Sequence, residues 1–262
     1  MKKKEIINHI VTWLNAYSNQ SFTQGFVIGI SGGIDSALTS TLCALTKKPV
    51  IVLNMPIRQH KAEFDRGAEH IEWLKKKFST VTSELVDLTG IFEKVENDFP
   101  PSIQDFLTMA NTRARLRMLT LYAFAGHHKM LVAGTGNKIE DFGVGFFTKY
   151  GDGGVDVSPI ADLLKSQVYA LAKELNVVES ILKAKPTDGL FADERSDEDQ
   201  IGATYDELEW AMTAIENKVD EKIFSVREKH VMEIYLGRNR ANKHKMEAIP
   251  VCKIPKELFK TT

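Results

Sequence analysis

The sequence predicts an α/β protein with a doubly wound, mostly parallel sheet, helices on both faces and extra C-terminal helices. Three observations lead to this class. Short apolar runs alternate with helical segments along residues 25–133. The runs lack polar alternation, as expected for strands that are buried on both faces. Hydrophobic residues make up 43% and charged residues 26% of the chain, which is typical of a globular domain.

The first predicted elements are a helix, a strand and a second helix. The apolar residues near the N-terminus fall on one helical face: Ile6, Ile7, Ile10, Val11 and Leu14. Residues 25–30 read GFVIGI, an apolar run bounded by glycine, and they predict a buried strand. A helix over residues 35–45 follows directly, so this stretch has the strand–turn–helix order of a ligand-binding α/β unit.

The next elements continue the alternation up to residue 133. Further strands are expected at residues 50–53 and 130–133, with a weaker one at 84–88, and helices at 60–78 and 102–126. The apolar side chains of the 102–126 helix exceed what one narrow stripe can bury in a monomer, so part of this helix is expected to face a second subunit.

A change of composition follows the fourth strand. Residues 134–159 hold seven glycines, and so long a loop in a compact domain is usually functional. Residues 162–175 return to a helix, 183–205 are irregular and polar, and two last helices are expected at 204–217 and 220–236.

Charge and cysteine content exclude several classes of protein. Lys plus Arg is 34 and Asp plus Glu is 35, a net charge of −1, whereas generic nucleic-acid or membrane-surface binders are usually basic. Cys43, expected in the core, and Cys252 offer neither a zinc site nor a disulfide scaffold, which favours a reducing compartment. No secretory or membrane-spanning segment is evident, so we expect a cytoplasmic protein. His60 and His70 are expected at the surface.

The strongest chemical signal is SGGIDS at residues 31–36, between a strand and a helix. Gly32 and Gly33 allow the backbone to turn tightly around an anion, and the helix N-terminus attracts phosphate. Asp35 would repel a bare phosphate, so an acid here indicates a divalent cation that bridges phosphates. Neither G-x-x-x-x-G-K-[ST] nor G-x-G-x-x-G occurs, which excludes a Walker A loop and a Rossmann fingerprint.

SGGIDS resembles the pyrophosphate loop of the ATP pyrophosphatases that adenylylate a substrate. Other segments resemble one branch of them, the ammonia-dependent NAD synthetases: NTRARLRM at 111–118, GTGNKIE at 134–140, FFTKYGDGGVD at 146–156, KPTDGL at 185–190 and the pair His244-Lys245. These segments are in the same order and span nearly the whole chain. The resemblance implies an adenine nucleotide alpha hydrolase-like fold and a single NAD synthetase domain over residues 1–262, without a glutaminase domain.

The resemblance also implies roles for individual residues. ATP would be bound by Gly29, Ile30, Ser31, Gly32, Gly33, Ile34, Asp35, Ser36, Thr135, Lys165 and Thr187. Asp35 and Glu140 would be magnesium ligands, and together with Lys165 they would form the catalytic group. Deamido-NAD would be bound by Arg115, Lys149, Asp156, His244 and Lys245. Arg113 and Arg117 flank Arg115 on a helix and splay away from it, so we interpret these two as surface or interface charges.

The activity implied is the ATP-dependent amidation of deamido-NAD with free ammonia to give NAD, AMP and pyrophosphate through an acyl-adenylate. Magnesium would be the cofactor and ATP a co-substrate, and the protein would be a homodimer that binds neither nucleic acid nor a membrane. Ammonium must lose a proton before it attacks, and Asp156 or an acid of residues 193–199 could accept it.

Two alternatives remain at this stage. One is a related adenylylating amidotransferase with a different acid substrate. The other is a non-catalytic adenine-nucleotide sensor, which needs a phosphate loop but neither the paired acids Asp35 and Glu140 nor a second substrate pocket. The chain also departs from its relatives at residues 54–56, NMP, where several carry an Arg before Leu-Pro. Arg58 could supply the missing contact.

Overall fold

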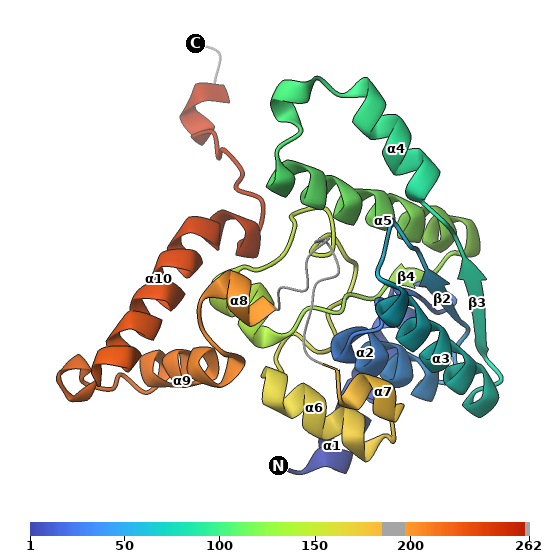
Figure 1. Ribbon diagram of the computed structural model, residues 1–262, viewed down its shortest axis with the longest axis horizontal. Helices are drawn as coiled ribbons and strands as arrows, with labels where there is room; N and C mark the ends of the chain where they lie inside the picture. The colour runs from blue at the N-terminus through green and yellow to red at the C-terminus, as the bar shows by residue number, and fades with distance from the viewer. Residues whose placement is uncertain (185–196, 260–262) are drawn as a thin grey trace.

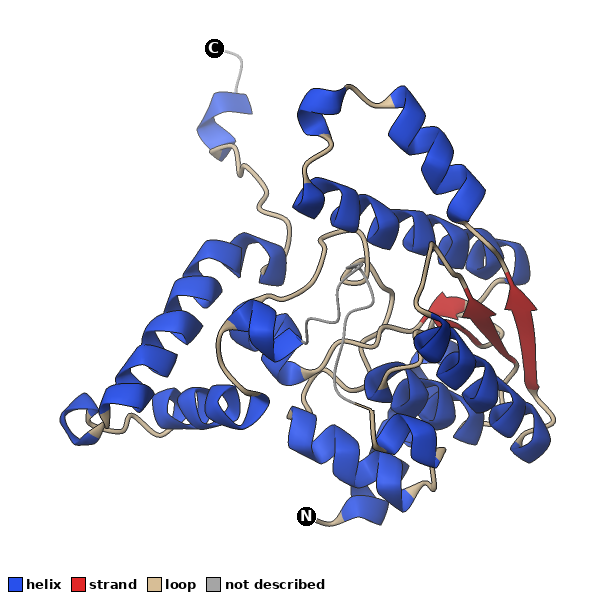
Figure 2. Ribbon diagram, viewed as in Figure 1, coloured by secondary structure: helices blue, strands red, loops and turns tan. Residues whose placement is uncertain are grey.

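A computed structural model describes residues 1–184 and 197–259 of the chain. Its centre is a parallel sheet in the order β3-β2-β1-β4 (Figures 1 and 2). The strands are β1 (Phe26–Gly29), β2 (Val50–Asn54), β3 (Val81–Leu85) and β4 (Leu131–Val132). A single parallel bridge between Ala133 and Val157 continues the sheet beyond β4. Because β1 lies between β2 and β4, the loop that follows β1 opens at the middle of the sheet edge.

Alternate residues of the central strands enter two different cores. Phe26 and Ile28 of β1 pack with α1 (Lys3–Gln20), α2 (Ile34–Leu45), α3 (Lys61–Lys77) and α6 (Lys165–Glu174) on one face. Val27 packs with α4 (Thr89–Asp98) and α5 (Phe106–His128) on the other. Both faces of the sheet are therefore covered, which confirms the predicted doubly wound α/β class.

A third core lies beside the sheet unit. It is formed by α9 (Tyr205–Glu216), α10 (Val226–Met246) and a π-helical turn over Ile139–Val144. Figure 1 shows α9 and α10 projecting away from the sheet. They are the extra C-terminal helices that the sequence predicts. The remaining short helices are α7 (Glu179–Leu182), α8 (Asp197–Ile201) and the 3₁₀ turns Pro101–Ile103, Glu221–Ile223 and Lys256–Phe259.

Several element boundaries differ from those predicted. β3 begins three residues early, since Val81 is the one fully buried residue in it and the alternation that marks a strand is weak. α4 was not predicted, because Phe92 is its sole buried residue. α10 runs to Met246 rather than 236, since its later turns are polar and helical periodicity of apolar residues is lost there. In the described part of the chain, no helix combines the length and the hydropathy needed to span a membrane.

Candidate active site

The loop that follows β1 forms the floor of a pocket at the carboxyl edge of the sheet. All eight residues from Gly29 to Ser36 line it. The Ser36 hydroxyl donates to the Gly33 carbonyl oxygen at 3.0 Å and accepts from the Ser31 amide at 3.3 Å, which fixes the turn against the first turn of α2. The loop thus presents backbone amides and a helix N-terminus to the pocket, an arrangement that binds phosphate.

Residue 32 of this turn must be glycine. Its φ is +86°, and a Cβ atom there would lie 2.4 Å from the Glu63 carbonyl oxygen. Both the left-handed backbone and the close approach of α3 therefore exclude a side chain.

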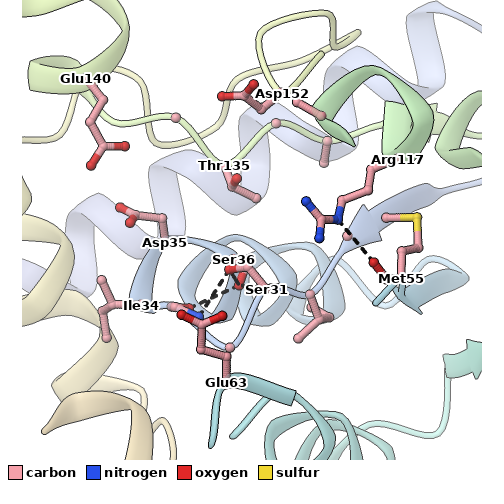
Figure 3. A pocket seen from close by; sticks show the side chains of 18 of the residues that line it. Ser31, Ile34, Asp35, Ser36, Met55, Glu63, Arg117, Thr135, Glu140 and Asp152 are labelled. Carbon is pink, nitrogen blue, oxygen red and sulfur yellow. Dashed lines mark hydrogen bonds between the residues drawn. The ribbon is translucent and has the colours of Figure 1, made fainter. Parts of the chain in front are cut away.

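Three other segments contribute polar side chains to the walls of the pocket. Thr135 and Glu140 follow β4, Lys165 is the first residue of α6, and Arg117 reaches in from α5. Figure 3 shows Asp35 and Glu140 at one end and Arg117 with Met55 at the other. Apolar side chains line the Arg117 end, namely Met55, Met118 and Leu121. The pocket therefore has a polar, acidic end and an apolar end.

Lys165 joins the two carboxylates at the acidic end. Its Nζ lies 2.6 Å from Oδ2 of Asp35 and 2.9 Å from Oε1 of Glu140. The Lys165 side chain is 5% exposed, against 17% for Asp35 and 15% for Glu140. The structure thus brings together all three residues that the sequence placed in the catalytic group.

Two neutral side chains, those of Asn137 and Tyr205, donate hydrogen bonds to these carboxylates. Asn137 is fully buried and donates from Nδ2 to Oδ1 of Asp35 at 3.2 Å. Its Oδ1 accepts from the backbone amides of Ile139 and Glu140, both at 3.1 Å. The Tyr205 hydroxyl donates to Oε1 of Glu140 at 2.5 Å. Neither Asn137 nor Tyr205 was identified from the sequence, although Asn137 lies within the GTGNKIE motif.

The pKa values of the three groups shift in opposite directions. Burial raises the pKa of Asp35, and the Lys165 charge offsets only part of this effect. Burial also opposes ionisation of Glu140, but Lys165, Tyr205 and Asn137 outweigh it and lower the pKa. The two carboxylates raise the pKa of Lys165 although burial disfavours its charge. Lys165 is therefore a permanent cation at neutral pH.

The chemistry of this donor set fits a magnesium ion. Asp35 and Glu140 supply carboxylate oxygens that converge on one cationic position, the one that the Lys165 ammonium fills. Mg²⁺ needs few protein carboxylates because substrate phosphates and waters complete its shell, and the phosphate loop lies next to both acids.

Three more acids line the same pocket, Glu63, Asp141 and Asp152. Burial, together with the charges of Glu140, Asp152 and Asp35, raises the pKa of Asp141 well above its usual value. Asp152 Oδ1 accepts from the Thr148 amide at 3.0 Å, and Figure 3 shows its carboxylate near Thr135. The acidic end is therefore larger than the predicted pair.

Comparisons with known proteins agree with this geometry. The profile of the family described as NAD synthase matches residues 6–249. The chain belongs to the NAD synthase family. It is 39% identical over 205 residues to the NH₃-dependent NAD⁺ synthetase of Mycoplasma genitalium. The aligned region covers 78% of this chain and 80% of the relative. The chain is 36% identical over 252 residues to the enzyme of that name from Methanosarcina mazei, covering 93% and 96% of the two chains.

One solved structure with a similar fold carries the name of a different synthetase. The NMN synthetase of Francisella tularensis superimposes with a TM-score of 0.84 and 30% identity, covering 98% of this chain and 99% of that one. The predicted fold and family are thus confirmed by both sequence and structure.

The residues predicted for deamido-NAD lie apart from the pocket. None of Arg115, Lys149, Asp156, His244 and Lys245 lines it. Three of them form a chain of contacts. Arg115 Nε donates to the Lys149 carbonyl oxygen at 3.3 Å, and Lys149 Nζ donates to the His244 carbonyl oxygen at 2.8 Å. These contacts bring together α5, the glycine-rich loop (residues 134–159) and the end of α10 at the surface.

Lys245 and Asp156 make other contacts with the glycine-rich loop and its neighbours. Lys245 Nζ donates to the carbonyl oxygens of Gly145 and Phe147 at 2.5 and 2.6 Å. Asp156 accepts from the Tyr122 hydroxyl and from the Val132 amide. Asp156 therefore fastens the glycine-rich loop to β4 and α5.

The structure describes two of three further residues named from the sequence. Arg58 is paired with Glu93 and Glu96 and does not line the pocket. Arg117, which we had interpreted as a surface or interface charge, lines the pocket and donates from Nε to the Met55 carbonyl oxygen at 3.1 Å. Thr187 lies outside the described residues.

Proposed function

We propose that this chain amidates deamido-NAD with ammonia at the expense of ATP. The observation that carries the proposal is the convergence of Asp35, Glu140 and Lys165 beside the phosphate loop. This arrangement would accept a nucleotide triphosphate with a divalent cation, whereas a nucleotide sensor needs only the loop. The two named NAD⁺ synthetases reported above support the substrate.

The pocket would accommodate the triphosphate and the adenine ring of ATP at its two ends. The triphosphate would lie on the amides of residues 31–36, with Thr135, Lys165 and Thr187 as further contacts. The adenine ring would lie against Met55, Met118 and Leu121, with Arg117 beside it. The nicotinate carboxylate would then attack the α-phosphorus, and the protein's contribution is to position the two anionic substrates and offset their charge.

Asp35 and Glu140 would hold Mg²⁺. When bound, this ion would neutralise phosphate oxygens and stabilise the charge that develops on the leaving pyrophosphate. Lys165 adds a permanent positive charge to the same pocket.

Arg115, Lys149, His244 and Lys245 would bind deamido-NAD, and Asp156 would hold the loop that carries Lys149. The contacts between α10, the glycine-rich loop and α5 support a substrate site there. We propose Asp152 as the acceptor of the ammonium proton, in place of Asp156, because Asp152 lines the pocket and Asp156 does not.

We also propose that the active protein is a homodimer, that it acts in the cytoplasm, and that residues 1–262 work as one synthetase domain with free ammonia as nitrogen donor. Large apolar side chains remain exposed on α5, which supports the dimer. The name of the similar Methanosarcina mazei enzyme, an NH₃-dependent NAD⁺ synthetase, supports the use of ammonia.

A second candidate function is the amidation of nicotinic acid mononucleotide. It is favoured by the fold match to the Francisella tularensis NMN synthetase. The two substrates share the nicotinate carboxylate, so the acidic end of the pocket would serve either of them. They differ in the adenylate half, which only the dinucleotide could place against the Arg115–Lys149–His244 contacts.

One experiment tests both candidates. The protein is supplied with ATP, Mg²⁺ and ammonium together with either acid, each labelled with ¹⁸O in its carboxylate. We expect NAD from deamido-NAD, with AMP and pyrophosphate in equal amounts and one label in AMP, because that oxygen bridges the adenylate. Preference for the mononucleotide would establish the second candidate. ADP as product, or AMP free of label, would contradict the adenylate route.

A further inference from the structure

The cation between Asp35 and Glu140 belongs to the protein itself. Lys165 Nζ lies within 3 Å of both carboxylates and is almost completely buried. An ion pair in this setting is strong only while both charges stay together, because an isolated buried charge is costly. A metal ion that binds to these two oxygens must therefore displace the ammonium.

The carboxylates do not depend on Lys165 for their positions. Asn137 fixes Asp35 through its other oxygen and is itself anchored by the backbone amides of Ile139 and Glu140. Tyr205 fixes Glu140 from α9. If Lys165 moved away, two oriented carboxylates would remain, as a metal site requires.

Lys165 lines the same pocket as the phosphate loop. Its side chain starts at the first residue of α6 and lies over the Tyr205 ring, with Nζ 4.6 Å from the ring centroid. A triphosphate placed on the phosphate loop offers the ammonium new anionic partners, so the nucleotide can draw Lys165 off the carboxylates.

We propose that Lys165 is a built-in competitor that keeps divalent cations off Asp35 and Glu140 until a nucleotide is bound. The free protein then binds metal weakly, and the metal is retained when ATP supplies partners for Lys165. This inference rests on the proposed use of Mg²⁺ by the two carboxylates, but its test requires no turnover. Failure of the amidation assay and failure of this test are therefore separate results.

The test is the binding of Mn²⁺ alone, measured by electron paramagnetic resonance of the free ion at pH 8. Mn²⁺ prefers the same oxygen ligands as Mg²⁺. Lys165→Met should bind Mn²⁺ more tightly than the unmodified chain by roughly tenfold or more, because it removes a competing charge from two buried carboxylates. Lys138→Met is the matched control, since Lys138 pairs with Glu216 and Asp162 instead.

A second substitution locates the effect. Adding Asp35→Asn to Lys165→Met should return Mn²⁺ affinity to the low value of the unmodified chain. If Lys165→Met bound Mn²⁺ no more tightly than the unmodified chain, or if the double variant kept the gain, the proposal would be wrong.

Thermal unfolding covers the case in which Lys165→Met is unstable without metal. Mn²⁺ should then raise the Tm of this variant far more than that of the unmodified chain, because the ion replaces the missing ammonium. A variant that stayed unfolded at saturating Mn²⁺ would overturn the proposal, since the two carboxylates would not form a metal site without Lys165.

Discussion

The Tyr205 hydroxyl lies 2.5 Å from Oε1 of Glu140, although 65 residues separate the two in the chain. Tyr205 is the first residue of α9, and the preceding residue, Thr204, caps this helix by accepting from the Glu207 amide. The cap fixes the first turn and hence the direction of the tyrosine. The core of the C-terminal helices is thereby connected to the acidic end of the pocket.

Tyr205→Phe should lower kcat by about tenfold and raise the Mg²⁺ concentration needed for half-maximal rate. The reason is that groups which orient a metal ligand typically contribute 10–100-fold to metal affinity or activity. The measurement is steady-state kinetics over a Mg²⁺ titration. Tyr235→Phe is the control, because Tyr235 is buried in the same helical core and does not contact Glu140. Equal Mg²⁺ dependence in both variants would contradict the prediction.

Asp35→Asn and Glu140→Gln should each reduce turnover by on the order of 10²-fold or more while the fold is kept. Each change removes a charge that holds a phosphate-bound cation, which contributes several kcal/mol to the transition state. Product formation and circular dichroism are measured together. Asp65→Asn removes an exposed acid of α3 and should leave turnover unchanged. Near-normal turnover in either folded site variant would remove that residue from the metal site.

Leu119→Lys should shift the protein from dimer towards monomer. α5 buries Met109, Met118 and Leu121 against the sheet, yet Leu107 and Leu119 on its outer side are 64% and 67% exposed. A second subunit packed on α5 would cover these exposed apolar side chains. Sedimentation velocity at micromolar concentration measures the effect. The control is Phe22→Ser, at an exposed aromatic side chain outside α5, and it should leave the sedimentation coefficient unchanged. A monomeric unmodified chain with full activity would contradict the proposed dimer.

The free energy of unfolding should fall in weak acid because of His70. Its side chain is fully buried, stacks on Trp73 and lies 3.0 Å from the Ser40 hydroxyl, and burial lowers its pKa to about 4. Below pH 6.5 the imidazole of His70 binds a proton in the unfolded chain, whereas in the folded chain it stays neutral until the pH falls to about 4, its lowered pKa. Stability is therefore complete above pH 6.5 and falls as the pH drops towards 4, by about 1.4 kcal/mol per pH unit at most.

Urea unfolding at several pH values measures this effect. His70→Leu should lose most of the pH dependence between pH 6.5 and 4, whereas His230→Gln, at an exposed histidine, should keep it. A stability profile of His70→Leu parallel to that of the unmodified chain would exclude His70 as the cause. The sequence had placed His70 at the surface, because helical spacing alone did not show that α3 turns this residue towards α2.

The strands and the phosphate loop were predictable because their signals are local. The apolar runs of β1 and β2 and the turn that carries Gly32 and Asp35 occupy short, continuous stretches of sequence. The partners of Glu140 were not, because Tyr205 belongs to a helix that the chain forms much later. Arg117 was misassigned for a related reason, since its partner, the Met55 carbonyl oxygen, lies 62 positions away in the chain.

Lys165 lies between these cases. The resemblance to the family indicated a contact with ATP, but the bond to two carboxylates follows only from the meeting of α6 with the loop after β4. Pairwise charge contacts between residues 130 positions apart leave no periodic trace in a single sequence.

The acidic end of the pocket is assembled from Asp35, Asn137, Glu140, Lys165 and Tyr205, which are spread over most of the chain. A nascent polypeptide that has left the ribosome only as far as α6 can complete the sheet but not this cluster, because α9 has not yet emerged. Capture of ATP with its metal would thus coincide with the end of synthesis. Chains that lack α9 would also lack the hydroxyl that orients Glu140, so protection from proteolysis that depends on both ATP and a divalent cation would be weaker in them than in complete molecules.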